Sequence, residues 1–376
     1  MNNKHKEMEE FIENTYKFKE KWNERCSKYN INEQPSVLPA VRRIVVIGDI
    51  HGDLNMMKQL LKAGGVIDND GKWTTGKNKD TVVVQVGDQI DRCRFNGILC
   101  KEKNATENDE GNDWVILQYM TKLHSMAQEH GGAVYSLLGN HELMNVDGDF
   151  RYVSYAGFKE FEDYKKPDGK SFPTGDYTQE NGTTLPYGAE AREWAFKPGN
   201  PISEFLACTR LMAITIGSNL FVHAGILPKI AKKYSVKNLN QLMSLYLWDS
   251  LKDNKNSYND VFNASSISPL WNRVYGKIKL DNNIKNMDDN TLKHCSRLLD
   301  PLEDIYKVNK IFVGHTPLLE NGIGSGCKGR VWLTDFGASA AFDKFDQNKS
   351  SDHRSEVRKA QVLEILKDGD EINVLK

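Results

Sequence analysis

Five short apolar runs in this chain each end in a residue that can bind a metal ion. The runs cover residues 44–47, 81–86, 133–138, 219–222 and 310–313. The polar residues that follow them are, in chain order, Asp49 with His51, Asp88, Asn140 with His141, His223, and His315. Helical patterns separate the first three runs, so this region predicts an α/β fold. Because functional side chains of such folds gather at the carboxyl ends of strands, we expect one shared site.

The ligand types at these strand ends restrict the metal. Carboxylates, imidazoles and an amide, without a thiolate, favour Mn ahead of Fe, Zn or Mg, and argue against a structural cysteine–zinc site. The two oxygens of Asp88 allow it to bridge two ions. Two divalent ions about 3.5 to 4 Å apart would hold a bridging hydroxide and stabilise both oxygens of a displacement at phosphorus. The pattern therefore predicts a dinuclear site for phosphoester hydrolysis.

The stretch VGDQIDRCR, residues 86–94, adds charged groups beside Asp88. Arg92 offers a planar guanidinium that matches phosphate oxygens. We expect His141 to protonate the leaving alkoxide, and Asp91 to hold the imidazole in position. Each motif alone is weak evidence, since a buried histidine is more often a hydrogen-bonded core residue. The conjunction of five motifs at five strand ends is what supports the prediction.

Taken together, the motifs resemble those of a known family. GDIHG, GDQIDR, GNHE, FVHAG and VGHTP, between residues 48 and 317, are similar to the signature of calcineurin-like metallophosphoesterases, and within them of PPP-type phosphatases. The segments LLGNHELMNVDGDFRYV and SPLWNRVYG most resemble the bacterial-type branch called Shewanella-like phosphatases. The resemblance implies a four-layer metallo-dependent phosphatase fold, in which two mixed β-sheets pack face to face with helices outside them.

The same resemblance implies roles for individual residues. The first metal would be held by Asp49, His51 and Asp88, and the second by Asp88, Asn140, His223 and His315. The phosphate would be contacted by Arg92, Asn140 and Arg273. His141 and Asp91 would form the proton-donating pair.

The resemblance also implies an activity, a metal-dependent phosphomonoesterase. Symmetrical diadenosine tetraphosphatases are similar at these motifs but usually lack the carboxylate of Asp91, so its presence favours a phosphomonoesterase. We expect a phosphoprotein substrate, dephosphorylated at Ser, Thr or Tyr by direct attack of the metal-bridging hydroxide. Hydrolysis of a nucleotide, a dinucleoside polyphosphate or another small phosphoester is the alternative. A noncatalytic binding relative is a remoter one, because every predicted ligand and the acid histidine are present.

Composition bears on partners and compartment. Lys+Arg 50 and Asp+Glu 51 leave a formal charge of -1, which indicates neither a nucleic-acid nor an anionic-membrane partner. No apolar run approaches the ~18 residues of a membrane span, and the N-terminus is too charged for a signal peptide. The six cysteines form no CxxC pair, so we expect free thiols and a cytoplasmic protein. Cys93, where the family usually has glycine, lies seven residues from Cys100, and an oxidation-sensitive switch is the alternative there.

The chain is predicted to divide into two parts. Residues 5–30 predict an amphipathic helix, and 31–39 predict a linker because Pro35 and Pro39 interrupt helix propagation. We therefore expect an N-terminal helical extension and linker, 1–40, and a catalytic domain, 41–376. Turn formers and aromatics at 145–215 and about 226–305 predict insertions over the sheet. A final hairpin is expected to turn at Asp368 and Gly369.

Overall fold

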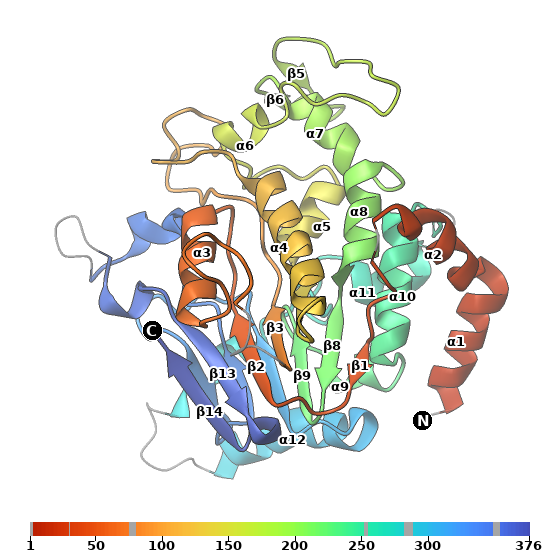
Figure 1. Ribbon diagram of the computed structural model, residues 1–376, viewed down its shortest axis with the longest axis vertical. Coiled ribbons are helices and arrows are strands. Elements are labelled where there is room, and N and C mark those ends of the chain that lie inside the picture. The colour runs from red at the N-terminus through yellow and green to blue at the C-terminus, as the bar shows by residue number, and fades with distance from the viewer. Residues whose placement is uncertain (1–2, 30, 75–79, 252–254, 282–288, 349–353) are drawn as a thin grey trace.

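The strands form two mixed sheets. A computed structural model describes residues 3–29, 31–74, 80–251, 255–281, 289–348 and 354–376. Within these residues each sheet has six strands, and a separate two-stranded hairpin stands at the top of Figure 1. Both sheets combine parallel and antiparallel pairs. The predicted fold class is confirmed.

The first sheet contains the first three predicted strands. Its order is β14 (Glu371–Leu375), β13 (Val362–Leu366), β2 (Arg43–Ile47), β3 (Thr81–Gln85), β4 (Ala133–Leu137) and β7 (Arg210–Leu211). The strands from β2 to β7 are parallel, and β13 and β14 form the predicted C-terminal hairpin. Every residue of β3 and β4 is buried, as expected of parallel strands covered on both faces. The outer cover is helices α3 (Leu54–Ala63) and α4 (Asp113–Gln128).

The second sheet holds the later predicted strands. Its order is β1 (Val37–Leu38), β8 (Ala213–Ile216), β9 (Asn219–Val222), β10 (Lys310–Val313), β12 (Val331–Leu333) and β11 (Gly324–Gly326). Strands β9, β10 and β12 are parallel neighbours. Phe221 and Phe312, whose stacked rings are 4.8 Å apart, lie in one apolar core with Val46 and Val84 of the first sheet. This shared core packs the two sheets against each other.

The other face of the second sheet is covered by helices of the two predicted insertions. The first, 145–215, contains α6 (Tyr155–Lys159), hairpin β5–β6 (Tyr177–Thr178 and Thr184–Leu185), α7 (Ala189–Phe196) and α8 (Pro201–Thr209). The second, about 226–305, contains α9 (Pro228–Ala231), α10 (Val236–Leu247), α11 (Asn259–Phe262) and α12 (Asp289–Tyr306). Residues 252–254 and 282–288 lie outside the described residues. Helix α12 lies at the opposite end of the molecule from β5–β6 (Figure 1), and its Leu298 and Leu302 share a core with Ile311 of the second sheet.

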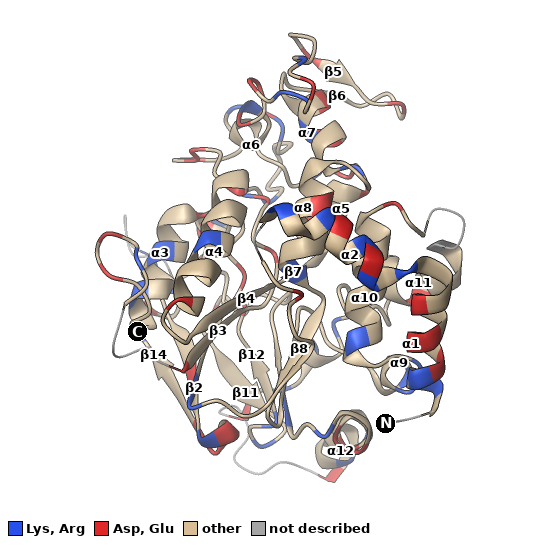
Figure 2. Cartoon of the chain, turned by 45° about the vertical axis from the view of Figure 1, so that its right-hand side comes forward, with Lys and Arg blue, Asp and Glu red and all other residues tan. Residues whose placement is uncertain are grey.

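The N-terminal segment differs from its prediction. Two helices, α1 (Asn3–Tyr16) and α2 (Phe18–Cys26), replace the single helix over 5–30, because Lys17 between them has a left-handed backbone with φ 52°. Residue 30 lies outside the described part of the chain. In Figure 2 basic residues stand at the N-terminal end of α1 and acidic residues follow them, and α2 carries both kinds. Ile12, Phe18 and Trp22 join the core that contains α8 and α10. The predicted linker contributes β1, which pairs with β8. The boundary at residue 40 stays a prediction.

The prediction of free thiols is wrong. Three disulfides join Cys26 to Cys208, Cys93 to Cys100, and Cys295 to Cys327, with Cα atoms 5.3, 5.7 and 5.6 Å apart. Two pairs span 182 and 32 residues, so only tertiary packing brings their members together and spacing alone gave no signal. Disulfides are rare in reducing compartments, and the cytoplasmic location stays a prediction that has lost this support. Among the described residues, no helix is long and apolar enough to cross a membrane.

The pairing of the cysteines can be tested directly. We expect protein purified without reductant, then denatured and treated with a maleimide, to incorporate no label, because all six thiols are in disulfides. The same protein should take up six labels after reduction, and peptide mass spectrometry should identify the three pairs. Labelling before reduction, or different pairs, would contradict the structure.

Candidate functional site

The predicted residues converge at the carboxyl ends of parallel strands from both sheets. Strands β2, β3 and β4 deliver residues from the first sheet, and β9 and β10 deliver residues from the second. Each polar residue follows within four positions of the end of its strand. All six predicted metal ligands are buried, with at most 6% of their surface exposed: Asp49, His51, Asp88, Asn140, His223 and His315.

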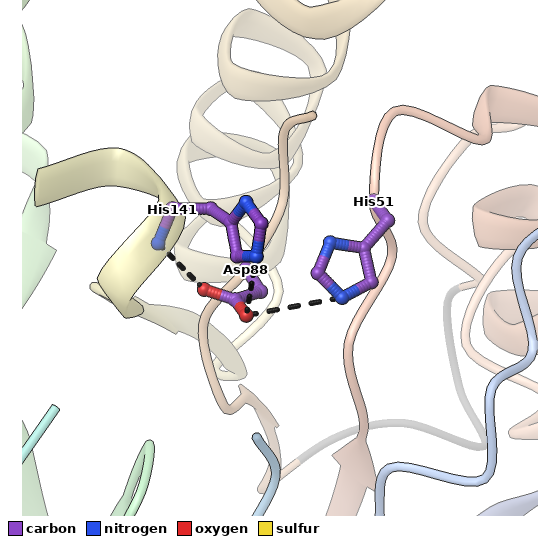
Figure 3. A group of neighbouring side chains, drawn as sticks. All are labelled: His51, Asp88 and His141. Atoms are coloured by element: carbon purple, nitrogen blue, oxygen red, sulfur yellow. Dashed lines mark hydrogen bonds and ion pairs between the residues drawn. The ribbon is translucent and has the colours of Figure 1, made fainter. Parts of the chain in front are cut away.

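Asp88 is the centre of this cluster. Its Oδ2 lies 3.3 Å from Nε2 of His223, and 3.8 Å from Nε2 of both His51 and His141. Its Oδ1 accepts a hydrogen bond of 3.0 Å from the backbone N–H of His141. Figure 3 shows the rings of His51 and His141 next to each other beside this carboxylate, with their centroids 4.8 Å apart. Three imidazoles from three different strand ends therefore share one carboxylate.

Two groups of side chains in the described part of the chain have the geometry of a metal site. One combines His51, Asp88 and His141, and the other combines Asp88, His223 and His315, with the ligand atoms of each group within 4.8 Å of one another. Asn140 joins the second group, since its Oδ1 lies 2.9 Å from Nε2 of His223. Asp88 is common to both groups.

The backbone at the site is held in unusual conformations. His51, Asp88, Asp91 and His315 all have positive φ, between 45° and 72°. Such conformations are uncommon for residues other than glycine and cluster at functional sites. Asp88 fits in this conformation because residue 139 has no side chain. A Cβ on Gly139 would lie 2.0 Å from Asp88 Oδ1. The glycine of the GNHE motif is thus required by the approach of two strand ends.

Burial and mutual charge shift the titration of these groups. Burial, reinforced by Asp335 and Asp88, raises the pKa of Asp49 well above its usual range. Burial also acts to raise the pKa of Asp88, but its interactions with His223, and then with His141 and His51, lower it well below that range. Burial lowers the pKa of His51 and of His315 well below the usual value. These imidazoles are therefore neutral at pH 7, as metal binding requires.

A second constellation surrounds His141. Its Nδ1 lies 2.7 Å from Oδ2 of Asp91, which is fully buried. The other oxygen of Asp91 accepts a hydrogen bond of 2.9 Å from Asn145 Nδ2. This arrangement fixes the imidazole with Nε2 directed toward Asp88 (Figure 3). The predicted Asp91–His141 pair is present in the structure.

Arg192, which sequence reasoning missed, supports that pair from the first insertion. This arginine is fully buried, and it donates from Nε to Asn145 Oδ1 at 2.8 Å and from Nη2 to Asp113 Oδ2 at 2.7 Å. Its Nη2 is also 3.5 Å from Asp91 Oδ1. Asp113 in turn accepts from the backbone N–H of Asp91. Nothing in the sequence around Arg192 indicates this role, because it depends on how α7 packs next to the site.

Glu142, also missed, holds the loop after β3. Its carboxylate accepts hydrogen bonds from the backbone N–H groups of Gly139 (2.6 Å), Asp88 (3.1 Å), Gln89 (2.7 Å) and Ile90 (3.3 Å). Burial, with the nearby Asp88 carboxylate, raises the pKa of Glu142 to about 7. Its position directly after His141 in GNHE was a signal that could have been used.

Three arginines near the site have different partners. Arg92 is paired with Asp53, at 3.0 Å, and lines a neighbouring polar cleft. Arg94 instead reaches the site, where its Nη2 lies 2.6 Å from His51 Nε2 and 3.4 Å from His141 Nε2. Arg273 is exposed at the rim, and it donates to the backbone oxygen of His315 at 3.0 Å.

Aromatic rings position Arg94. Its guanidinium lies over the rings of Tyr152 and Phe342, with its carbon 5.3 and 4.8 Å from their centroids. Such contacts stabilise a cation at a fixed place. Arg92 was predicted to bind phosphate because of its planar guanidinium in the motif GDQIDR. In the structure Arg94, two positions later, is the arginine that contacts His51 and His141.

Asp335 is a further buried carboxylate that the sequence analysis passed over. It follows strand β12 in the same way that Asp49 follows β2, and it is 2% exposed. Burial raises its pKa to about 6. An acid directly after an apolar strand was the same signal that identified the other ligands.

Comparison with known proteins identifies the family. The family model described as calcineurin-like phosphoesterase matches residues 42–319, most of the chain. The chain belongs to the calcineurin-like phosphoesterase family. This confirms the predicted resemblance and the prediction of a phosphoesterase.

Several relatives of this phosphoesterase are known. It is 35% identical over 269 residues to an uncharacterised protein of Acanthamoeba polyphaga mimivirus, which covers 66% of this chain and 95% of that protein. Shewanella-like protein phosphatase 2 of Arabidopsis thaliana is 29% identical over 79% of this chain and 71% of its own length. Shewanella-like protein phosphatase 1 of Plasmodium berghei is 26% identical, over 79% and 67%.

Solved structures share the fold. The cold-active protein-tyrosine phosphatase of a psychrophilic Shewanella species superposes with a TM-score of 0.57, at 21% identity, over 91% of this chain and 83% of that chain. A second structure of a cold-active protein tyrosine phosphatase gives a TM-score of 0.59 over 93% of this chain and 83% of that one, also at 21% identity. At this identity the likeness concerns the fold alone.

The divalent ions that this family implies fit the residues present. Oδ1 of Asp49 is buried and has no hydrogen-bond partner among the described residues, which leaves a lone pair for a cation. Its other oxygen accepts from the backbone N–H of His315 at 3.0 Å. A buried carboxylate oxygen without a hydrogen-bond partner is destabilising, and a metal ion bound to Oδ1 would remove that cost. The mixture of carboxylate, imidazole and amide donors suits such an ion.

Proposed function

We propose that this phosphoesterase hydrolyses phosphate monoesters of proteins at Ser, Thr or Tyr. The reaction would add water to the phosphorus and release the hydroxyl of the side chain and inorganic phosphate. The observation that carries the proposal is the contact of 2.7 Å between His141 and Asp91 beside the Asp88 cluster. This pair supplies a proton donor, which an alkoxide leaving group requires.

His141 acts as the general acid in this proposal. Because Asp91 accepts the proton on Nδ1, the protonated imidazole presents its second proton on Nε2 toward the site. Asp91 stabilises that charge, and Asn145 and Arg192 hold Asp91 in turn. Transfer of the Nε2 proton to the departing oxygen yields a neutral alcohol.

Six residues would hold two divalent ions, with Mn the expected metal. Asp49, His51 and Asp88 would bind the first, and Asp88, Asn140, His223 and His315 the second. When bound, ions at such a site ionise water and neutralise the phosphoryl oxygens. The chain prepares for this by lowering the pKa of His51 and His315, and by orienting Asp88 through the hydrogen bond from the backbone N–H of His141.

Arginines would bind the phosphoryl group. The guanidinium of Arg94 lies against both His51 and His141 and over two aromatic rings, and its contact with His51 Nε2 would open when that nitrogen binds an ion. Arg92 is committed to Asp53, so a phosphate contact by Arg92 requires that ion pair to open. Arg273, beside His315, would approach from the rim, and Asn140 would contribute its amide.

The choice of a protein substrate rests on the relatives. Two of them are named Shewanella-like protein phosphatases, and the structural neighbours are protein tyrosine phosphatases. The carboxylate of Asp91 separates this chain from dinucleoside polyphosphate hydrolases that are otherwise similar at the site. No feature of the described residues favours a nucleotide, which becomes an outcome of the test.

The activity is tested with p-nitrophenyl phosphate and with phosphopeptides. Wild-type protein should hydrolyse both after loading with Mn, lose activity with a chelator, and contain two divalent ions per chain by elemental analysis. Asp88→Asn should lower kcat by about 100-fold or more and reduce the metal content, because it weakens both predicted ion sites. Absence of hydrolysis with any divalent metal would refute the enzyme. Hydrolysis of dinucleoside polyphosphates alone would refute the phosphoprotein assignment.

The two neighbouring arginines can be separated by inhibition with inorganic phosphate. Arg94→Ala should raise the inhibition constant and KM by roughly 10- to 100-fold, the value of a lost charge-assisted bond. Arg92→Ala should have a smaller effect, because its guanidinium pairs with Asp53. Metal content measured on each variant controls for loss of the ions. A larger effect of Arg92→Ala would assign the phosphate contact to Arg92.

A further inference from the structure

An apolar groove adjoins the site on the side of His141. It has a volume of about 660 Å³, and its apolar lining consists of Phe95, Leu99, Phe150, Tyr152 and Leu185. Phe95 and Leu99 are both 56% exposed, and neighbouring exposed apolar side chains of this size indicate an interaction site. We define these five residues and the space between them as the apolar groove.

A loop closed by the Cys93–Cys100 disulfide carries Phe95 and Leu99. Cys93 and Cys100 close the loop, and with Ala105 they form a small buried cluster under it. The backbone N–H of Cys93 donates to the backbone oxygen of Tyr152 at 3.2 Å. The exposed side chains of Phe95 and Leu99 are thus carried by a loop that is fixed at its base. A closed loop loses less freedom when it binds a partner.

Charged groups at the groove are already paired within the protein. Arg151 forms an ion pair of 2.7 Å with Asp149, and Lys101 donates to the backbone oxygen of Thr184 at 2.7 Å. Asp147 accepts from the hydroxyl of Tyr246. The surface left for a ligand is therefore apolar rather than ionic.

The groove adjoins the site through Tyr152. The ring of Tyr152, one wall of the groove, lies 5.0 Å from the ring of His141. Since His141 is the proposed acid, the oxygen that it protonates belongs to the leaving group. Arg94 enters the site while the next residue, Phe95, points outward into the groove. The leaving group therefore passes Tyr152 toward Phe95 and Leu99.

We infer that the apolar groove binds an apolar side chain of the polypeptide that carries the phosphorylated residue. This inference rests on the proposed function, because only a protein substrate extends from the phosphate past Tyr152 to the loop. Apolar contact with Phe95 and Leu99 removes exposed surface from water and favours binding. The groove thereby selects phosphorylation sites that have an apolar residue close to the phosphorylated one.

The test is a set of phosphopeptides in which one leucine is moved from position -3 to +3 on a background of alanine. Each peptide is made with phosphoserine and with phosphotyrosine, and p-nitrophenyl phosphate serves as a substrate that does not reach the groove. The enzymes are wild type, the double variant Phe95→Ser with Leu99→Ser, and a control, Phe11→Ser. Phe11 is 46% exposed on α1, away from the groove.

For wild type we expect leucine at one or two adjacent positions to raise kcat/KM roughly tenfold over the alanine peptide, mainly through KM. The double variant should lose this preference and retain activity on p-nitrophenyl phosphate, and Phe11→Ser should keep both. Fluorescence anisotropy of the unphosphorylated peptides, in metal-free buffer, should give the same ranking. This readout does not depend on a loaded enzyme.

Three outcomes would overturn the inference. If the double variant matches wild type on every peptide while p-nitrophenyl phosphate is hydrolysed, the groove plays no part and the proposed phosphatase stands. If the double variant changes only the hydrolysis of small apolar phosphoesters, the groove holds a small leaving group. If wild type hydrolyses nothing with any divalent metal, the proposed function fails as well.

Discussion

The site depends on the carboxylate of Asp88, which lies within 3.8 Å of three imidazoles that come from three different strand ends. Its backbone is left-handed and can stay so because Gly139 leaves space, while Glu142 binds the N–H groups of the same loop. Every neighbour of Asp88 is buried, so an unpaired charge there would be destabilising. The fold therefore brings strands of both sheets to one point that cations would stabilise.

Much of this site could be predicted from the sequence, because the signals were local. Apolar strands that end in Asp, Asn or His indicated the six predicted metal ligands, and parallel neighbours bring such ends together. What failed was the part that depends on tertiary packing. The sequence did not indicate that Cys26 would meet Cys208, or that Arg192 would reach Asp91 from an insertion. It also did not indicate that Arg94 would reach His51 and His141, because that contact depends on the path of a loop.

The first insertion and the Cys93–Cys100 loop both lie next to His141 and line the apolar groove. Arg192 of α7 lies 3.5 Å from the Asp91 carboxylate that contacts His141, the proposed acid, and Tyr152 of the same insertion borders both His141 and the apolar groove. The Cys93–Cys100 loop completes the groove and carries Arg94 into the site. In this proposal, residues outside the five short motifs, Arg94, Phe95, Leu99 and Arg192, shape with Tyr152 the side on which the leaving group departs. A shared phosphoesterase site would in this way serve a particular set of substrates.

The central claim is that His141, held by Asp91, protonates the leaving group, and its most direct test is the dependence of kcat/KM on leaving-group pKa. For the His141→Asn variant we expect a loss of roughly 10²- to 10⁴-fold with alkyl phosphates and a much smaller loss with p-nitrophenyl phosphate, whose leaving group needs little protonation. The Asp91→Asn variant should follow the same pattern. An equal loss with all esters, or full activity toward alkyl phosphates, would contradict the account.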